Sequence, residues 1–158
     1  MEKFQITKEG YQKLRSEIDN LKNIERPKII SQIATARELG DLRENADYHA
    51  SREKQGFIEA QIADFEDKYL RAEVIDITKL SGDIVIFGAT VKIENTDNEK
   101  ILTYKIVSDF EADVDLGYIS NTSPVARALL GRKVGDQVDI STPKGLVIYE
   151  ILAISFTE

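Results

Sequence analysis

The sequence predicts an α+β fold in which a long antiparallel α-helical coiled-coil hairpin, residues 1–76, precedes a small domain of antiparallel strands with one short helix, residues 77–158. Three observations support this division. Apolar residues recur at steps of three and four over much of the first 72 residues, which is the spacing of a coiled-coil seam. Near residue 74 the pattern changes to short alternating segments, and clusters of turn residues separate them.

The two arms of the hairpin differ in how regular their seams are. The second arm alternates steps of three and four throughout, at Tyr48, Ser51, Gln55, Ile58, Ile62, Phe65, Tyr69 and Ala72. The first arm keeps this spacing, loses its phase around Arg26-Pro27 and resumes; its members are Tyr11, Leu14, Ile18, Leu21, Ile30, Ile33 and Ala34. Proline removes a helical hydrogen bond, so we expect a kink or an irregular turn there. Arms of about 30 residues predict a rod roughly 45 Å long.

The C-terminal part is expected to form short strands. We predict them at residues 84–87, 90–94, 101–107, 137–141 and 146–155. Turn residues at 95–98 and 142–145 connect consecutive strands, as antiparallel hairpins require. One short helix interrupts the strands, because Ser123 offers an N-cap, Pro124 suits the first helical position and Gly131 ends the segment.

Composition excludes several kinds of site. The 158 residues contain no cysteine and one histidine, so disulfides, thiol nucleophiles and thiolate zinc sites are excluded, and His49 alone cannot build a histidine metal cluster. A net charge of −7 argues against tight autonomous binding to duplex nucleic acid, which requires a basic surface. No apolar run reaches membrane-spanning length and the first residues lack the pattern of a signal peptide, so we expect a cytoplasmic protein with no membrane partner.

Two carboxylates, Asp41 and Glu44, stand at the predicted turn of the hairpin. Spacing alone favours a structural role, in which Gly40 ends the first arm, Asp41 caps the second and Glu44 completes a capping box. The alternative is that both acids offer oxygen ligands to Mg²⁺ from a tip near residues 40–45. Two acids are too few for a tight site, so such a tip would complete a metal site that belongs to another macromolecule. A capping carboxylate keeps free lone pairs, so the two interpretations overlap.

Several segments spread over nearly the whole chain carry a further signal. They are residues 7–21, 40–50, 55–57, 74–76, 85–91 and 123–131. Together, and in this order, they resemble the Gre family of bacterial transcription elongation factors, which stimulate transcript cleavage. Separate motifs in the right order are more specific than any one of them.

The resemblance implies a mechanism. The hairpin would enter the secondary channel of a backtracked bacterial RNA polymerase, and a C-terminal domain of FKBP-like fold would dock on the β′ coiled-coil rim. Asp41 and Glu44 would be the catalytic and metal-holding residues, helping to retain the second Mg²⁺ of the polymerase active site and its attacking water. The 3′ end of the nascent RNA would then leave as short fragments. The chain would thus be no enzyme itself, would need no cofactor when free, and is expected to be a monomer.

Basic and polar residues near the tip take supporting roles under this resemblance. Arg37 and Arg52 match family positions that face the extruded RNA, and a guanidinium suits bidentate phosphate contact. On general grounds, both are equally typical of a solvated helix face. Asn45 and Tyr48 are expected to support the tip.

The candidate polymerase-docking surface is the loop and short helix at residues 121–130, with Ser123, Pro124 and Ala126. An apolar helical side of this kind is also typical of core packing.

Three other functions stay open at this level. A channel-binding factor or inhibitor would lack cleavage stimulation, and the spacing of Asp41 and Glu44 argues against it. Prolyl isomerase activity could accompany an FKBP-like fold, but fold alone does not imply activity and the aromatic residues of this half are sparse. A structural adaptor predicts that the tip acids tolerate neutral replacement.

Overall fold

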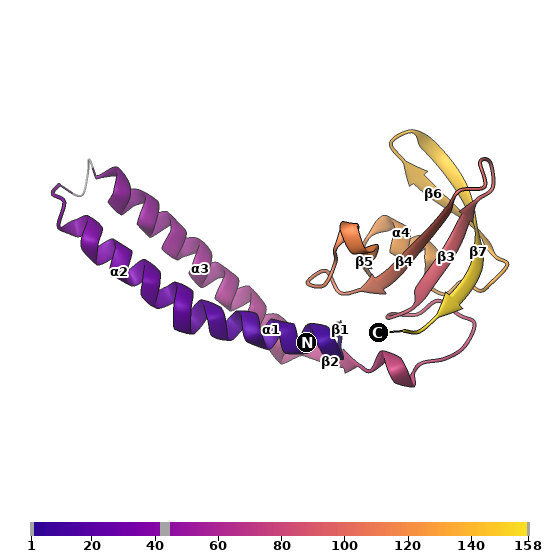
Figure 1. Ribbon diagram of the computed structural model, residues 1–158, viewed down its shortest axis with the longest axis horizontal. Helices are drawn as coiled ribbons and strands as arrows, with labels where there is room; N and C mark the ends of the chain where they lie inside the picture. The colour runs from indigo at the N-terminus through magenta and orange to yellow at the C-terminus, as the bar shows by residue number, and fades with distance from the viewer. Residues whose placement is uncertain (1, 42–44, 158) are drawn as a thin grey trace. The chain divides into compact units, whose positions relative to one another are not determined.

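The computed structural model describes residues 2–41 and 45–157, which form two compact units (Figure 1). One unit contains residues 11–72; the other combines residues 2–10 with the chain from residue 73 onward. The sequence predicts the boundary between residues 76 and 77. The structure assigns the first residues to the second unit, because strand β1 (Phe4–Thr7) pairs with strand β2 (Ala72–Ile75). Strands of four residues carry too short a period to be recognised before their pairing is known.

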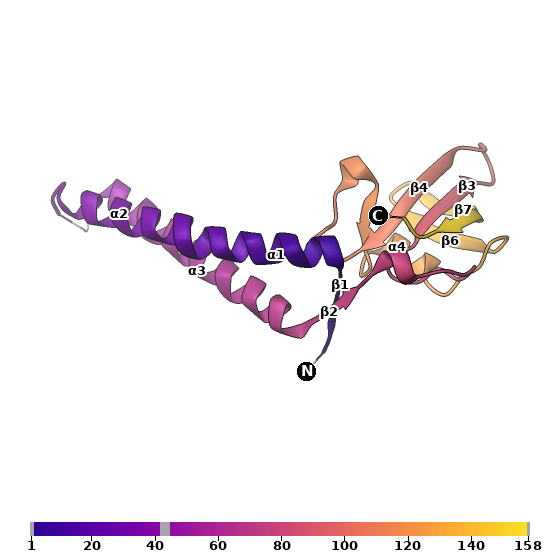
Figure 2. The same cartoon turned by 60° about the horizontal axis from the view of Figure 1, so that its bottom comes forward.

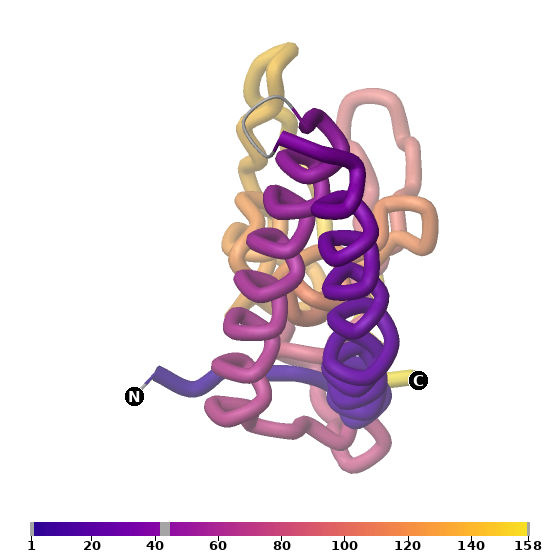
Figure 3. Tube along the Cα trace, turned by 90° about the vertical axis from the view of Figure 1, so that its left-hand side faces the viewer, coloured from indigo at the N-terminus to yellow at the C-terminus, as the bar shows by residue number. Residues whose placement is uncertain are grey.

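The predicted helical hairpin is confirmed. Its first arm is built from α1 (Lys8–Asn20), a π-helical turn η1 (Leu21–Glu25) and α2 (Arg26–Arg37), and its second arm is α3 (Ala46–Arg71). Figure 3, which faces the hairpin tip, shows α2 and α3 alongside each other. Figure 2 shows that α1 and the C-terminal end of α3 spread apart. No helix among the described residues is long and apolar enough to cross a membrane.

A continuous apolar seam holds the two arms together. Its buried members are Leu21, Ile29, Ile33, Ile58 and Ile62, and Tyr48 and Phe65 pack against them. The second-arm prediction is confirmed, since every predicted position of that arm is buried or half-buried.

In the first arm, two predicted seam positions are wrong. Ile30 and Ala34 are exposed, whereas Ile29 and Ala36 are buried. The π turn η1, which ends at Glu25 two residues before Pro27, confirms the expected irregular turn and determines which positions of α2 are buried. A π turn accommodates one extra residue per turn, so the side that faces α3 shifts by one position after it. Pro27 then occupies the start of α2, where its missing N–H leaves no bond broken.

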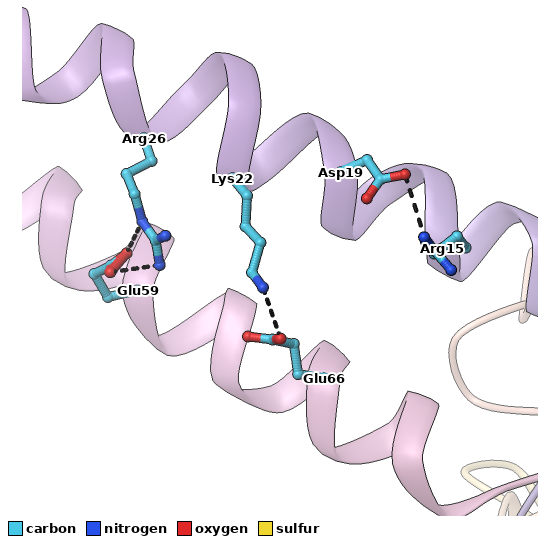
Figure 4. Close-up of polar contacts among 6 residues, drawn as sticks. All are labelled: Arg15, Asp19, Lys22, Arg26, Glu59 and Glu66. Carbon is cyan, nitrogen blue, oxygen red and sulfur yellow. Dashed lines mark hydrogen bonds and ion pairs between the residues drawn. The ribbon is translucent and has the colours of Figure 1, made fainter.

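Ion pairs connect the arms outside the seam (Figure 4). Arg26 donates from Nε and Nη2 to the two carboxylate oxygens of Glu59, at 2.9 and 2.8 Å, and Lys22 Nζ lies 2.8 Å from Glu66. These side chains are partly solvated, and such pairs each contribute about 1 kcal/mol or less. We infer that the seam supplies most of the stability and that the ion pairs favour its register.

The second unit is built on a five-stranded sheet of order β5-β4-β3-β7-β6. Its strands are β3 (Thr90–Asn95), β4 (Ile101–Val107), β5 (Tyr118–Ser120), β6 (Gln137–Thr142) and β7 (Gly145–Ser155). Neighbours are antiparallel, as predicted, except that β5 runs parallel to β4. Helix α4 (Pro124–Leu129) confirms the predicted short helix and contributes to the core of this unit.

The strand predicted at residues 84–87 is wrong. Val85 and Phe87 are buried and Ile86 is exposed, so the alternation that suggested a strand is real. Among the residues that the structure describes, the segment nevertheless makes a single bridge, between Ile84 and Lys133, and it turns at Gly88, whose φ is 90°. Alternating burial therefore arose without a ladder of paired residues.

Glu111 explains why the first residues belong to the second unit. Its carboxylate accepts hydrogen bonds from the Thr7 N–H at 3.2 Å, from the Thr7 hydroxyl and from the Ser108 hydroxyl at 2.7 Å. The Thr7 hydroxyl in turn accepts from the Gly10 N–H at 3.0 Å. A Cβ atom at residue 10 would overlap the Glu111 side chain, so only glycine fits there without rearrangement.

The neighbouring isoleucines of α2 test the phase of the seam. Ile29 is 1% exposed and Ile30 is 52% exposed. Ile29→Ala should lower the free energy of unfolding of the hairpin by about 2–5 kcal/mol, because it leaves a cavity in the seam. Ile30→Ala, the matched control, should cost about 1 kcal/mol or less. Urea unfolding followed by circular dichroism measures both, and equal losses would contradict the assigned phase.

Candidate functional site

The tip of the hairpin begins where α2 ends, at Arg37, and closes where α3 begins, at Ala46. Backbone N–H groups of Glu38 and Leu39 donate to the carbonyls of Thr35 and Ala36 and tighten the end of α2. Gly40 has a φ of 126°, a region that side chains disfavour, and this glycine turns the chain away from the first arm as predicted. Asp41 follows it as an exposed residue.

The N-cap of α3 is Asn45, so the prediction that Asp41 caps α3 is wrong. The Asn45 side chain accepts a hydrogen bond from the Tyr48 N–H at 3.1 Å. Its amide nitrogen also donates to the carbonyl oxygen of Ala36 at 2.5 Å, a bond that a carboxylate cannot make. Asp41 is therefore not used in capping α3. Glu44, the other predicted acid, lies outside the described residues.

The described residues do not form a complete metal site at the tip. Within residues 2–41 and 45–157, no three side chains of histidine, cysteine, aspartate or glutamate come together to hold a metal ion. Asp41 still fits one part of such a site, since carboxylate oxygens are the ligands that Mg²⁺ prefers. The described part of the tip can contribute a ligand and cannot supply a full coordination shell.

The structure brings the two predicted RNA-contacting residues together. Arg37 at the end of α2 and Arg52 on α3 line one groove of about 220 Å³, together with Ile30 and Ala34. The Arg37 guanidinium carbon lies 5.8 Å from the centroid of the Tyr48 ring, within the range of a cation–π contact. We refer to these four lining residues, with Ile33 and Gln55, as the arginine groove.

A second groove lies on the other side of the seam, close to the tip. It measures about 350 Å³, and its lining includes Thr35, Leu39, Asp47 and Ser51. The side chains that line this groove carry one negative charge, whereas those of the arginine groove carry two positive charges. The two faces of the hairpin near its tip therefore differ in charge.

The predicted docking segment divides into surface and core. Ser123 is the N-cap of α4, and its hydroxyl accepts from the Ala126 N–H at 3.2 Å. Pro124 is exposed. Ala126, however, is 0% exposed and belongs to the core of the second unit, so it is corrected from docking residue to core residue.

Sequence reasoning also missed two exposed apolar side chains in this unit. Val114 and Leu116 lie in the short 3₁₀ helix η3 (Val114–Leu116), which leads into β5. An isolated aliphatic residue in a loop gives no periodic signal, and it is as typical of a small core as of a surface. Only the folded structure shows whether such a residue is buried in a core or exposed at the surface.

Comparisons with known proteins give matches over nearly the whole chain. The family described as transcription elongation factor, N-terminal, matches residues 4–74, and the family of the GreA/GreB C-terminal domain matches residues 80–156. The chain is 52% identical to the transcription elongation factor GreA of Phenylobacterium zucineum over 156 residues, which cover 99% of both chains. It is also 52% identical to GreA of Rickettsia prowazekii, over 99% of this chain and 96% of that protein.

Among solved structures, GreA factor homolog 1 (Gfh1) of Thermus thermophilus is 29% identical, with a TM-score of 0.45. That match covers 96% of this chain and 98% of the other.

The cap of α4 can be tested by changing Ser123. Ser123→Ala removes the acceptor for the Ala126 N–H and should lower the free energy of unfolding of the second unit by about 1 kcal/mol. Ser123→Asp keeps an acceptor and should stay within about 0.5 kcal/mol of the natural protein. Urea unfolding with a probe of the sheet measures the difference. Equal stability of both variants would show that the hydroxyl contributes no cap.

Proposed function

The chain belongs to the GreA/GreB family of transcription elongation factors, and on this premise we propose that it stimulates RNA polymerase to cleave the 3′ end of backtracked nascent RNA. The hairpin enters the secondary channel of the polymerase and carries its tip to the active site. The observation that carries the proposal is that Asn45, and not Asp41, caps α3. Asp41 lies exposed at the turn of the hairpin, between the end of α2 and the start of α3.

The tip acids Asp41 and Glu44 supply the part of the mechanism that the polymerase lacks. They hold the second Mg²⁺ jointly with ligands of the polymerase, since the described residues bring no complete site together. When bound there, the metal would supply an activated water nucleophile, and in two-metal chemistry a second ion would stabilise the leaving oxygen. Cleavage then depends on the presence of the factor, so normal elongation proceeds without loss of the transcript. The chain itself is not the enzyme.

The arginine groove receives the extruded RNA. Arg37 and Arg52 present guanidinium groups from the two arms to one space, and guanidinium matches the geometry of a phosphate. This local pair of cations makes RNA contact compatible with a net charge of −7, because the contact forms inside the polymerase and not on free nucleic acid.

The second unit attaches the factor to the polymerase. We assign docking on the β′ coiled-coil rim to the start of α4, with the half-buried Ser123 and the exposed Pro124, and exclude the buried Ala126. The factor acts as a monomer in the cytoplasm, where one hairpin occupies one channel.

The role of the tip acids is tested on a backtracked, purified bacterial elongation complex. Asp41→Ala and Glu44→Ala should each lower the maximal rate of 3′ fragment release by about 10²-fold or more, because loss of a metal ligand removes several kcal/mol of transition-state stabilisation. The concentration of factor that gives the half-maximal rate should stay within about 2-fold of that of the natural protein, since neither acid is proposed to contact the docking site. Glu38→Ala, a carboxylate of the same turn, is the matched control and should keep full activity.

Three results would contradict this role. Parallel loss of binding would make the acids part of the docking surface. Full activity of both variants would favour a structural adaptor. Competition for the channel by the natural protein without any cleavage would favour a binding factor or inhibitor.

Salt dependence tests the arginine groove. Arg37→Ala and Arg52→Ala should each weaken RNA contact and reduce the slope of log activity against log salt by about 0.7, the value for one phosphate contact on a single strand. Lys54→Ala removes an exposed cation of α3 that does not line the groove, and it should leave the slope unchanged. An equal effect of all three changes would point to general charge attraction.

A further inference from the structure

We propose that Asn45 is a positioning residue for cleavage, because its carboxamide joins the end of α2 to the start of α3 and so fixes how Asp41 is presented. This inference depends on the proposed function of Asp41. Asn45 does not touch RNA or metal in this proposal; it acts through the loop that carries the acid.

The two bonds of Asn45 satisfy the ends of two different helices. The last carbonyls of a helix and its first N–H groups have no partner within the helix. The Asn45 amide nitrogen donates to the Ala36 carbonyl, near the end of α2, and its oxygen accepts from the Tyr48 N–H, in the first turn of α3. A single side chain therefore caps both arms at once.

The orientation of the amide is fixed by its partners. Rotating it by half a turn would face nitrogen against the Tyr48 N–H and oxygen against the Ala36 carbonyl, which pairs donor with donor and acceptor with acceptor. Serine and aspartate can cap α3 but have no amide donor for Ala36. The double cap thus needs a carboxamide at this distance from both helices.

Both ends of the loop that carries Asp41 meet at the same carbonyl. Ala36 also accepts from the Leu39 N–H at 3.1 Å, in the turn by which the chain leaves α2. Asn45, where the chain enters α3, binds that same oxygen. Asp41 lies between these two points in sequence, so its backbone has less freedom than in a loop whose ends are joined only through the seam.

Both helices that the double cap joins are held by packed side chains next to the cap. Ala36 is buried in the first arm, and Tyr48 packs against the seam and under the Arg37 guanidinium. A displacement of about 1 Å of a catalytic group can cost about 10²-fold in rate. Anchoring the loop to the seam therefore has a direct consequence for a carboxylate that must reach a metal inside another protein.

Two substitutions separate the bond from Asn45 to the Ala36 carbonyl from the capping of α3. Asn45→Ser keeps an acceptor for the Tyr48 N–H but has no separate amide nitrogen to reach the Ala36 carbonyl, whereas Asn45→Ala loses both bonds. On the backtracked complex we expect both variants to lower the maximal cleavage rate by about 10–100-fold and to raise the Mg²⁺ concentration needed for half-maximal rate. The half-saturating factor concentration and the helicity by circular dichroism should not change. A maximal cleavage rate of Asn45→Ser equal to that of the natural protein would overturn the proposal. A change confined to the half-saturating factor concentration would overturn it too.

A second measurement on the free protein keeps this inference separate from the proposed function. Backbone order parameters of Gly40 and Asp41 from NMR relaxation should fall in Asn45→Ser relative to the natural protein, while those of the seam residue Ile58 stay the same. Unchanged order parameters would overturn the double cap. Cleavage that survives Asp41→Ala would instead overturn the proposed function and leave the order-parameter result standing.

Discussion

The seam between the two arms depends on a single irregularity, the π-helical turn η1. Because this turn takes up an extra residue, Ile29, Ile33 and Ala36 face α3 over the whole of α2. If the first arm continued as a regular helix from Leu21, Lys28, Gln32 and Thr35 would face the second arm in place of Ile29, Ile33 and Ala36. The position of the Ala36 carbonyl, and with it the contact to Asn45, follows from that shift of phase. Geometry at the tip is thus set by a turn that lies three helical turns or more away along the first arm.

Charged side chains of the hairpin form separate local groups, which the net charge of the chain does not reveal. The ion pairs Arg26–Glu59 and Lys22–Glu66 neutralise cations along the middle of the rod, where they connect the arms. Near the tip, Arg37 and Arg52 line one groove without a carboxylate among its lining residues. A short-range basic patch on an acidic protein binds an anion only when other contacts bring it close, because attraction between exposed charges is screened beyond about 10 Å. This fits the proposed function, in which docking and RNA contact would be carried by different units.

The second unit combines a packed sheet with a buried polar anchor for the start of the chain. Val91, Ile93 and Ile106 form its core together with residues of α4. Glu111 then binds the Thr7 N–H and hydroxyl, so the residues just before and at the start of α1 belong to this unit. Each hydrogen-bonding group of the anchor has a partner, and a carboxylate satisfied in this way is costly to disrupt.

Local signals in the sequence determined the hairpin, the second-arm seam, strands β3, β4, β6 and β7, and the capped helix α4. Each of these is visible as a period or a cap within a few residues. The tertiary structure alone decided three things: the phase of the first-arm seam, the pairing of β1 with β2, and the choice of Asn45 over Asp41 as the N-cap. In the candidate site, the sequence named Asp41, Arg37 and Arg52, but their neighbours followed only from folding. The physical reason is that asparagine and aspartate cap a helix equally well, and only the nearby Ala36 carbonyl, supplied by the other arm, requires an amide donor.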